Sequence, residues 1–209
     1  MVPDGVPVLY VDDRLVVIDK PAGLLAVPGR GELKQDCAAA RVQALYADAL
    51  AVHRLDQATS GLLVFGRGGA AQRALSQAFA QRRVAKRYTA LVTGLLSQDR
   101  GSIDAPLAAD WPNRPRQRVD ELHGKPSLTH WQVLARDASA GTTRLVLEPV
   151  TGRSHQLRVH LLAIGHPILG DTLYAPHHAA GRLMLHASEL TIPRPDDARS
   201  MQLCSAVPF

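Results

Sequence analysis

A series of short apolar runs, each closed by glycine, proline, aspartate or another turn-forming residue, constrains the fold of this chain more than any other feature. β-Branched and other apolar residues dominate the runs, which is typical of strands. The predicted strands are residues 6–11, 15–19, 50–52, 61–65, 87–92, 129–134, 143–150, 183–185 and 190–192. The predicted helices are residues 36–49, 70–83 and 154–164, with Asp36 and Ser154 as N-caps of the first and third. Strands outnumber helices without strict alternation, which favours an α+β fold with a central mixed, largely antiparallel sheet flanked by helices.

Size and composition fit a single globular domain over residues 1–209. The longest apolar stretches are far shorter than the roughly 20 residues that a membrane span needs. Residues 1–13 lack the basic start and long apolar run of an export signal, so we expect a cytoplasmic protein without a membrane partner. Cys37 and Cys204 are the two cysteines, and no pair stands at zinc-motif spacing, so the sequence suggests neither a structural zinc site nor a disulfide framework.

The basic residues are unevenly distributed. The net charge is +5, and no acidic residue lies between Asp56 and Asp99, a stretch that holds six basic residues. A second basic cluster falls in the long connection 94–121, which also has three prolines, and it consists of Arg114, Arg116 and Arg118. A solvated face is the commoner explanation for any one cluster. Two clusters and a positive total favour a polyanionic partner, and the long connection is a candidate binding loop.

The polar segment 53–61 lies between two predicted strands and carries a candidate catalytic carboxylate. Asp56, next to Arg54 and followed by the hydroxyls of Thr59 and Ser60, would stay ionised and can act as a nucleophile or a base. The alternative is a hydrogen-bonded turn held by an aspartate–arginine pair, and composition alone favours that turn.

A second polar segment, residues 151–160, joins a predicted strand to a helix N-terminus, where unpaired amides favour anions. Arg158 lies one turn into the helix, so it can reach a carboxylate or a phosphate. His155 and His160 are about 140° apart around a helix and do not form a one-face metal pair. We therefore expect no metal, and we interpret these histidines as hydrogen-bonding or RNA-contacting groups.

Residues 66–71 fit the dinucleotide fingerprint GxGxxA between a strand and a helix. The ribose-binding acidic residue expected about 20 positions later is missing, and Lys86 and Arg87 would suit an NADP phosphate instead. The chain beyond lacks regular βαβ alternation. A glycine-rich turn is the simpler interpretation, and an NADP-binding reductase stays open as an alternative.

Together these segments make the chain similar to the RluA-type pseudouridine synthases. The segments that carry the resemblance, in the family's order, are residues 20–24, 52–61, 86–90, 151–160, 165–171 and 185–187. Residues 27–30 and 110–115 further resemble the branch of the family that modifies both 23S rRNA and the tRNA anticodon loop.

The resemblance implies isomerisation of uridine to pseudouridine without a cofactor or metal, in a cleft across an α+β sheet. It makes Asp56 the essential carboxylate, which would attack the sugar C1′ or the uracil ring, or initiate glycal formation. It places Tyr88 against the uracil and pairs Arg158 with Asp56. Arg54 would replace the flipped base, and Leu185 or a neighbour would pack beneath the uracil. The full set of expected substrate-binding residues is His53, Arg54, Leu55, Thr59, Ser60, Gly61, Arg114, Arg116, Arg153, His155 and Leu185.

The expected partner is therefore a stem-loop of rRNA or tRNA. We expect a monomer without an obligate protein partner, and recognition by the catalytic domain alone, without an N-terminal RNA-binding domain of the S4 type. A non-catalytic RNA-binding module with the same fold is the remaining alternative.

Overall fold

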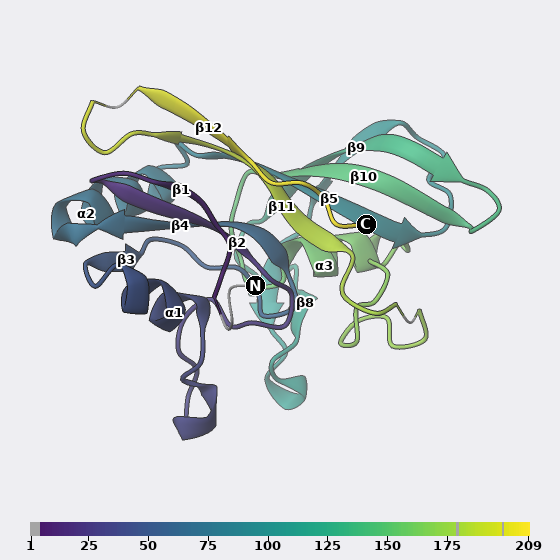
Figure 1. Cartoon of the computed structure of the whole chain (residues 1–209). Coiled ribbons are helices and arrows are strands. Elements are labelled where there is room, and N and C mark those ends of the chain that lie inside the picture. The colour runs from purple at the N-terminus through teal and green to yellow at the C-terminus, as the bar shows by residue number, and fades with distance from the viewer. Residues whose placement is uncertain (1–4, 179, 198) are drawn as a thin grey trace. The chain divides into compact units, whose positions relative to one another are not determined.

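The computed structural model in Figure 1 describes residues 5–178, 180–197 and 199–209. Two compact units make up the chain: the first holds the residues up to 86 together with 187–208, and the second holds 87–186 with Phe209. The chain passes from one unit to the other inside two strands, β5 (Ala85–Thr93) and β11 (Leu185–Pro193). Each unit is described by itself below.

The first unit is an antiparallel arrangement of strands with two α-helices. Its remaining elements are β1 (Val8–Val11), β2 (Leu15–Lys20), η1 (Glu32–Lys34), α1 (Ala38–Leu45), β3 (Ala49–Ala51), β4 (Ser60–Arg67), α2 (Gly68–Ala80) and β12 (Ser200–Cys204). Strand β2 pairs with β1 and β4, β3 also pairs with β4, and β12 pairs with β11, all antiparallel. Residues 60–66 of β4 are all buried, so this strand forms the centre of the unit's core.

Helix α2 starts directly after β4, and Gly66 explains how the chain turns back on itself there. A Cβ at Gly66 would lie 2.5 Å from the backbone nitrogen of Gln72, so only glycine lets the helix pack this closely on the strand. The pairings of β4 with β2 and β3 are antiparallel, whereas a dinucleotide-binding unit is built from parallel strands. The fingerprint at residues 66–71 is therefore a packing feature, and the reductase interpretation loses its structural basis.

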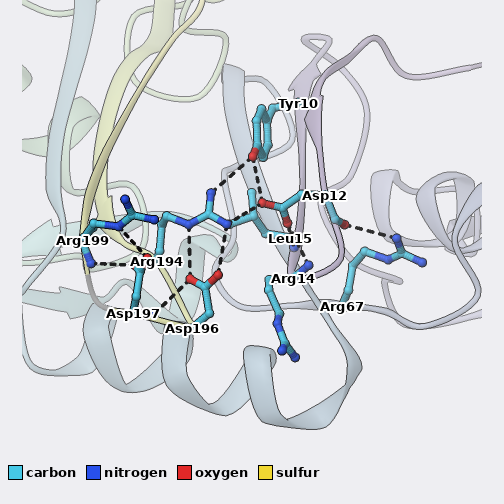
Figure 2. A network of polar contacts seen from close by, with 9 residues as sticks. All are labelled: Tyr10, Asp12, Arg14, Leu15, Arg67, Arg194, Asp196, Asp197 and Arg199. Atoms are coloured by element: carbon cyan, nitrogen blue, oxygen red, sulfur yellow. Dashed lines mark hydrogen bonds and ion pairs between the residues drawn. The ribbon is translucent and has the colours of Figure 1, made fainter.

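A polar network ties the end of β11 to the turn between β1 and β2 (Figure 2). The Asp12 carboxylate accepts the backbone N–H groups of Arg14 and Leu15 at 2.8 and 2.9 Å, which closes the turn. Its second oxygen accepts from the guanidinium of Arg194 at 3.0 Å, and Arg194 also pairs with Asp196 at 3.2 Å. Most of these groups lie near solvent, so the network adds little stability and mainly fixes the two hairpin ends.

The second unit has a four-stranded antiparallel arrangement and a separate hairpin. Its remaining elements are β6 (Arg100–Asp104), β7 (Leu107–Ala109), η2 (Trp111–Asn113), β8 (Gln117–Val119), β9 (Leu128–Asp137), β10 (Thr142–Pro149) and α3 (Gln156–Ala163). The strand order is β5–β10–β9–β6, and β7 pairs with β8 alone. A small apolar cluster of Leu107, Val159 and Tyr174 joins this hairpin to α3.

The predicted fold class, α+β with a mixed central sheet and flanking helices, is confirmed, and several local predictions are corrected. The stretch 94–121, which the sequence predicts as a long connection, contains three strands, because β6 pairs with β9 outside the stretch and β7 and β8 pair with each other as a hairpin. The N-cap of α1 is Cys37, whose sulfur accepts from Ala40 N–H, while Asp36 pairs with Arg41. The N-cap of α3 is His155 in the left-handed conformation, so Ser154 lies outside the helix.

None of the helices within residues 5–178, 180–197 and 199–209 has both the length and the apolar character that crossing a bilayer requires. The prediction of a single catalytic domain over residues 1–209 stays a prediction.

Candidate active site

The loop that carries Asp56 lies in the first unit between β3 and β4, and a buried lysine holds it. The Lys20 side chain is 0% exposed. Its ammonium donates to the carbonyl oxygens of Pro21 and Leu24, both at 2.8 Å, and of Gln57 at 3.1 Å. A charged group this deeply buried is tolerated only when strong acceptors surround it, and three carbonyls meet that need.

Two further hydrogen bonds join the same segments. The backbone N–H of Gly23 donates to the Gln57 carbonyl at 2.8 Å, and the Gln57 side-chain amide donates to the Gly23 carbonyl at 2.9 Å. Thr59 N–H donates to the carbonyl of Asp56 at 3.1 Å, which closes the turn on the other side. The backbone around Asp56 is therefore fixed from both directions. Lys20 and Gln57 lie within segments 20–24 and 52–61 of the resemblance, but the sequence predicts no role for either residue.

His53, at the start of the loop, makes a hydrogen bond and a ring contact with other residues of the first unit. Its Nε2 accepts the backbone N–H of Val64 at 3.0 Å, and its ring stacks on Phe79 with centroids 4.4 Å apart. Burial lowers the pKa of His53 to about 3, and the nearby Lys86 ammonium contributes. A neutral imidazole that accepts from β4 fixes the entry to the loop. Its predicted contact with substrate stays a prediction.

The other predicted residues of this loop divide into a buried set and one exposed arginine. Leu55, Thr59 and Ser60 are 5%, 3% and 3% exposed. Gly61 has φ 109°, and a Cβ there would lie 2.4 Å from the carbonyl oxygen of Ala187, so the strand packs against β11 only if this residue is glycine. Arg54 is exposed. The buried residues shape the loop, and Arg54 is the predicted substrate-binding residue of this loop that is exposed.

In the second unit, α3 places Arg158 in a buried ion pair that the sequence did not assign. The Arg158 Nε and Nη2 atoms donate to the two carboxylate oxygens of Asp171, each at 2.7 Å, and the side chains are 4% and 1% exposed. Asp171 also accepts the backbone N–H groups of Leu173 and Tyr174 at 3.0 and 3.1 Å. This fork fixes the plane of the guanidinium and uses two of its five N–H donors.

A buried polar network anchors α3 itself. Gln156 accepts from the Thr151 hydroxyl at 2.7 Å and donates to the Thr129 hydroxyl at 3.0 Å. His160 bonds the same Thr129 hydroxyl through Nδ1 at 2.9 Å and the Ala105 carbonyl through Nε2 at 3.0 Å. Burial lowers the pKa of His160, so the ring is neutral, with Nε2–H donating to the carbonyl. The prediction that this histidine is a hydrogen-bonding group is confirmed.

The remaining predicted residues all belong to the second unit. Tyr88 is half-buried in β5 opposite Leu147 of β10, and Leu185 is buried at the start of β11. Arg153 is exposed, and the Nδ1 of His155 lies 2.8 Å from the Tyr174 hydroxyl.

The hairpin between β7 and β8 carries the second basic cluster. The Arg114 guanidinium lies 3.2 Å from the ring centroid of Trp111, and Arg116 lies 5.3 Å from that of Tyr174. Trp111 was not among the predicted site residues, although an aromatic residue within an arginine-rich loop was the available signal.

The structure thus brings together Arg158, Asp171, Tyr174 and His155 in the second unit, and Lys20, Gln57 and the Asp56 loop in the first. The pairing of Arg158 with Asp56 stays a prediction. Across residues 5–178, 180–197 and 199–209, no group of three or more histidine, cysteine, aspartate or glutamate side chains is arranged to hold a metal ion.

Comparison with known proteins shows what this arrangement is similar to. Residues 14–163 match the family model described as RNA pseudouridylate synthase. The chain is 50% identical over 203 residues to the dual-specificity RNA pseudouridine synthase RluA of Yersinia pestis, which covers 95% of this chain and 98% of that protein. The protein of the same name from Escherichia coli strain K12 is 49% identical over 205 residues, with 97% and 93% coverage. The solved structure of human RNA pseudouridylate synthase domain containing 1 has a TM-score of 0.83 and 30% identity, covering 99% of this chain and 85% of that one.

Proposed function

Because this chain belongs to the RNA pseudouridylate synthase family, and is thereby an isomerase, we propose that its substrates are specific uridines in 23S rRNA and in a tRNA anticodon loop. The observation that carries this proposal is the identity of about half the residues, over nearly the full length, with relatives named for dual specificity. The basic hairpin and the exposed Arg54 support an RNA partner, since arginine binds phosphate oxygens in pairs and stacks on bases.

Asp56 is the proposed essential carboxylate. In the overall reaction the bond between N1 of uracil and C1′ of the sugar breaks, a bond between C5 and C1′ forms, the C5 proton leaves, and N1 takes up a proton. Asp56 can begin this sequence by attack at C1′, by attack at the ring, or by starting glycal formation. The hydrogen bonds of Lys20 and Gln57 support this role because they fix the backbone next to Asp56. A reacting group must keep its position to within a fraction of an ångström.

Arg158 is the proposed partner that keeps Asp56 ionised and oriented, since a neighbouring cation favours the charged carboxylate. The support for this role is the fork with Asp171, which gives the guanidinium one orientation before substrate arrives. Tyr88 is proposed to lie against the uracil and to take part in removal of the C5 proton.

A base in a stem-loop must leave the stack before chemistry can reach it. Arg54 suits the gap that the flipped base leaves, because its planar guanidinium stacks like a base and its side chain is exposed. Leu185, buried at the start of β11, suits the apolar surface beneath the uracil.

The experiment that tests the function is tritium release from RNA labelled at uridine C5, with unmodified tRNA and rRNA as substrates. We expect release by the wild-type protein and none by Asp56→Asn, while RNA affinity stays within a few-fold because this carboxylate makes few phosphate contacts. Asp13→Asn, at an exposed turn outside the site, is the matched control and should release tritium normally. Release that survives Asp56→Asn would contradict the assignment of the carboxylate, and absence of release from both RNAs would favour a non-catalytic RNA-binding module.

A further inference from the structure

The two tryptophans of the second unit lie in opposite environments. Trp131 is 8% exposed, and its indole covers Gly101, where a Cβ would lie 2.6 Å from the ring. Trp111 is 67% exposed at the tip of the β7–β8 hairpin. Trp131 is explained by packing, whereas a large apolar ring in solvent contributes little to stability. Trp111 therefore needs another explanation.

Arg114 gives Trp111 an unusual setting. The guanidinium carbon lies 3.2 Å from the centroid of the indole, so the charged plane rests directly on the ring. Within residues 5–178, 180–197 and 199–209, no carboxylate forms an ion pair with Arg114, and the contact of its guanidinium is with the indole. The result is a stack of two flat groups, one aromatic and one cationic, at an exposed tip.

The tip is held by hydrogen bonds of its own. Asp110 N–H donates to the Arg116 carbonyl at 3.0 Å, and Arg116 N–H donates to the Asn113 carbonyl at 3.0 Å. Asn113 donates to Asp110 twice, from its backbone to the carbonyl at 3.1 Å and from its side chain to the carboxylate at 2.9 Å. The stack is thus presented on an ordered turn, which lowers the entropy that a partner must overcome on binding.

The same hairpin is anchored to the element that carries Arg158. Gln117 N–H donates to the Tyr174 hydroxyl at 2.7 Å, and Tyr174 packs with Val159 of α3. The Arg158 guanidinium lies over the Tyr174 ring, 5.0 Å from the ring centroid. A group bound at the tip is therefore held at a fixed position relative to α3.

From these observations we propose that Trp111 and Arg114 form a stacking platform for one unpaired base of the substrate RNA, distinct from the uridine that reacts. Unpaired bases in RNA loops stack on aromatic rings and on arginine guanidinium planes, and a cationic stack also suits the neighbouring phosphate. The proposal rests on the proposed function, which supplies an RNA loop as the ligand, and it makes Trp111 a positioning residue for that loop. A protein partner is the other outcome that the test must recognise.

The test uses the fact that the chain has two tryptophans. In a Trp131→Phe background, Trp111 is the only indole, and its fluorescence reports directly on stacking. We expect an unmodified anticodon stem-loop RNA to quench this fluorescence and to protect it from acrylamide. Unquenched fluorescence at an RNA concentration that saturates binding would overturn the proposal. Tritium release by the same protein is measured in parallel, so that a failed platform and a failed enzyme give different results.

Affinity measurements then identify the base. We expect Trp111→Leu, which keeps an apolar side chain without a ring face, to weaken RNA binding by roughly tenfold with an unchanged salt dependence. Trp111→Phe should recover most of that loss. A series of stem-loops, each with one abasic loop nucleotide, then tests every base in turn. At one position, loss of the base should weaken binding to the wild-type protein as much as Trp111→Leu does. The same abasic RNA should bind the Trp111→Leu protein no more weakly than the intact RNA does. Equal additive losses at every position, or normal RNA affinity of Trp111→Leu, would contradict the platform, and the latter would favour a protein partner at this tip.

Discussion

The loop around Asp56 and the hairpin tip at residues 110–116 are two segments with proposed functions, and the protein holds them in opposite ways. The Asp56 loop is held by the ammonium of Lys20, whose side chain is 0% exposed, and by the hydrogen bonds between Gln57 and Gly23. The hairpin tip is held by its own turn and by one anchor at Tyr174, and it exposes 67% of Trp111. A reacting carboxylate needs a fixed position away from competing water, whereas a surface for RNA must present its side chains outward. The comparison indicates that substitutions at the first kind of support affect folding, and substitutions at the second affect binding alone.

The largest effect is expected where a buried charge would lose its partner. Asp171→Ala leaves the Arg158 guanidinium buried without its carboxylate, and such a loss costs about 3–5 kcal/mol of unfolding free energy. Glu148→Ala breaks the Arg87–Glu148 pair, whose side chains are 44% and 48% exposed, and should cost less than about 1 kcal/mol. Chemical denaturation measures the unfolding free energy that each variant loses. Equal losses would show that burial does not make the Arg158–Asp171 pair more important for stability than the exposed pair.

The next largest loss of unfolding free energy is expected where Lys20 no longer holds the Asp56 loop. Lys20→Met removes the three hydrogen bonds from the buried ammonium to backbone carbonyls, so we expect a loss of about 3 kcal/mol, at roughly 1 kcal/mol for each bond. Lys34→Met, at an exposed position of the same unit, is the matched control and should change stability by no more than about 0.5 kcal/mol. A Lys20→Met protein with wild-type stability would mean that the loop is held by its other contacts.

At neutral pH the smallest effect is that of His53, which shows itself only as a pH dependence in acid. The pKa of His53 falls from 6.5 to about 3 on folding. Between these two pH values the unfolded chain is protonated at His53 and the folded protein is not. Its contribution therefore reduces stability as the pH falls from 6.5 toward 3. His53→Gln keeps an acceptor for the Val64 N–H but does not titrate, and its denaturation midpoint should fall less steeply over this range. His123→Gln, at an exposed position, should follow the wild type, and identical slopes for all three proteins would show that His53 is not the source.

The sequence was sufficient to predict most of the fold and the identity of several site segments. Strand patterns and turn residues predicted the α+β class because alternation and turn chemistry act over a few neighbouring residues. The helix starts were less well predicted, since Cys37 and His155 cap α1 and α3 in place of Asp36 and Ser154. Residues 66–71 match a nucleotide-binding pattern, whereas the structure shows that β4 pairs antiparallel with β2 and β3 and that Gly66 lets α2 pack closely on the strand.

The sequence by itself determined the family, the charge distribution and the segments that carry the candidate chemistry. The tertiary structure alone decided which residues support those segments. The Lys20 ammonium meets the Gln57 carbonyl 37 positions away, and Gln117 meets the Tyr174 hydroxyl across 57 positions. Even the fork between Arg158 and Asp171 joins residues 13 positions apart, beyond the end of α3. Periodicity reports only on the element in which a residue lies, whereas these partners are set by how separate elements pack, and that packing also left Trp111 at the surface while burying Trp131.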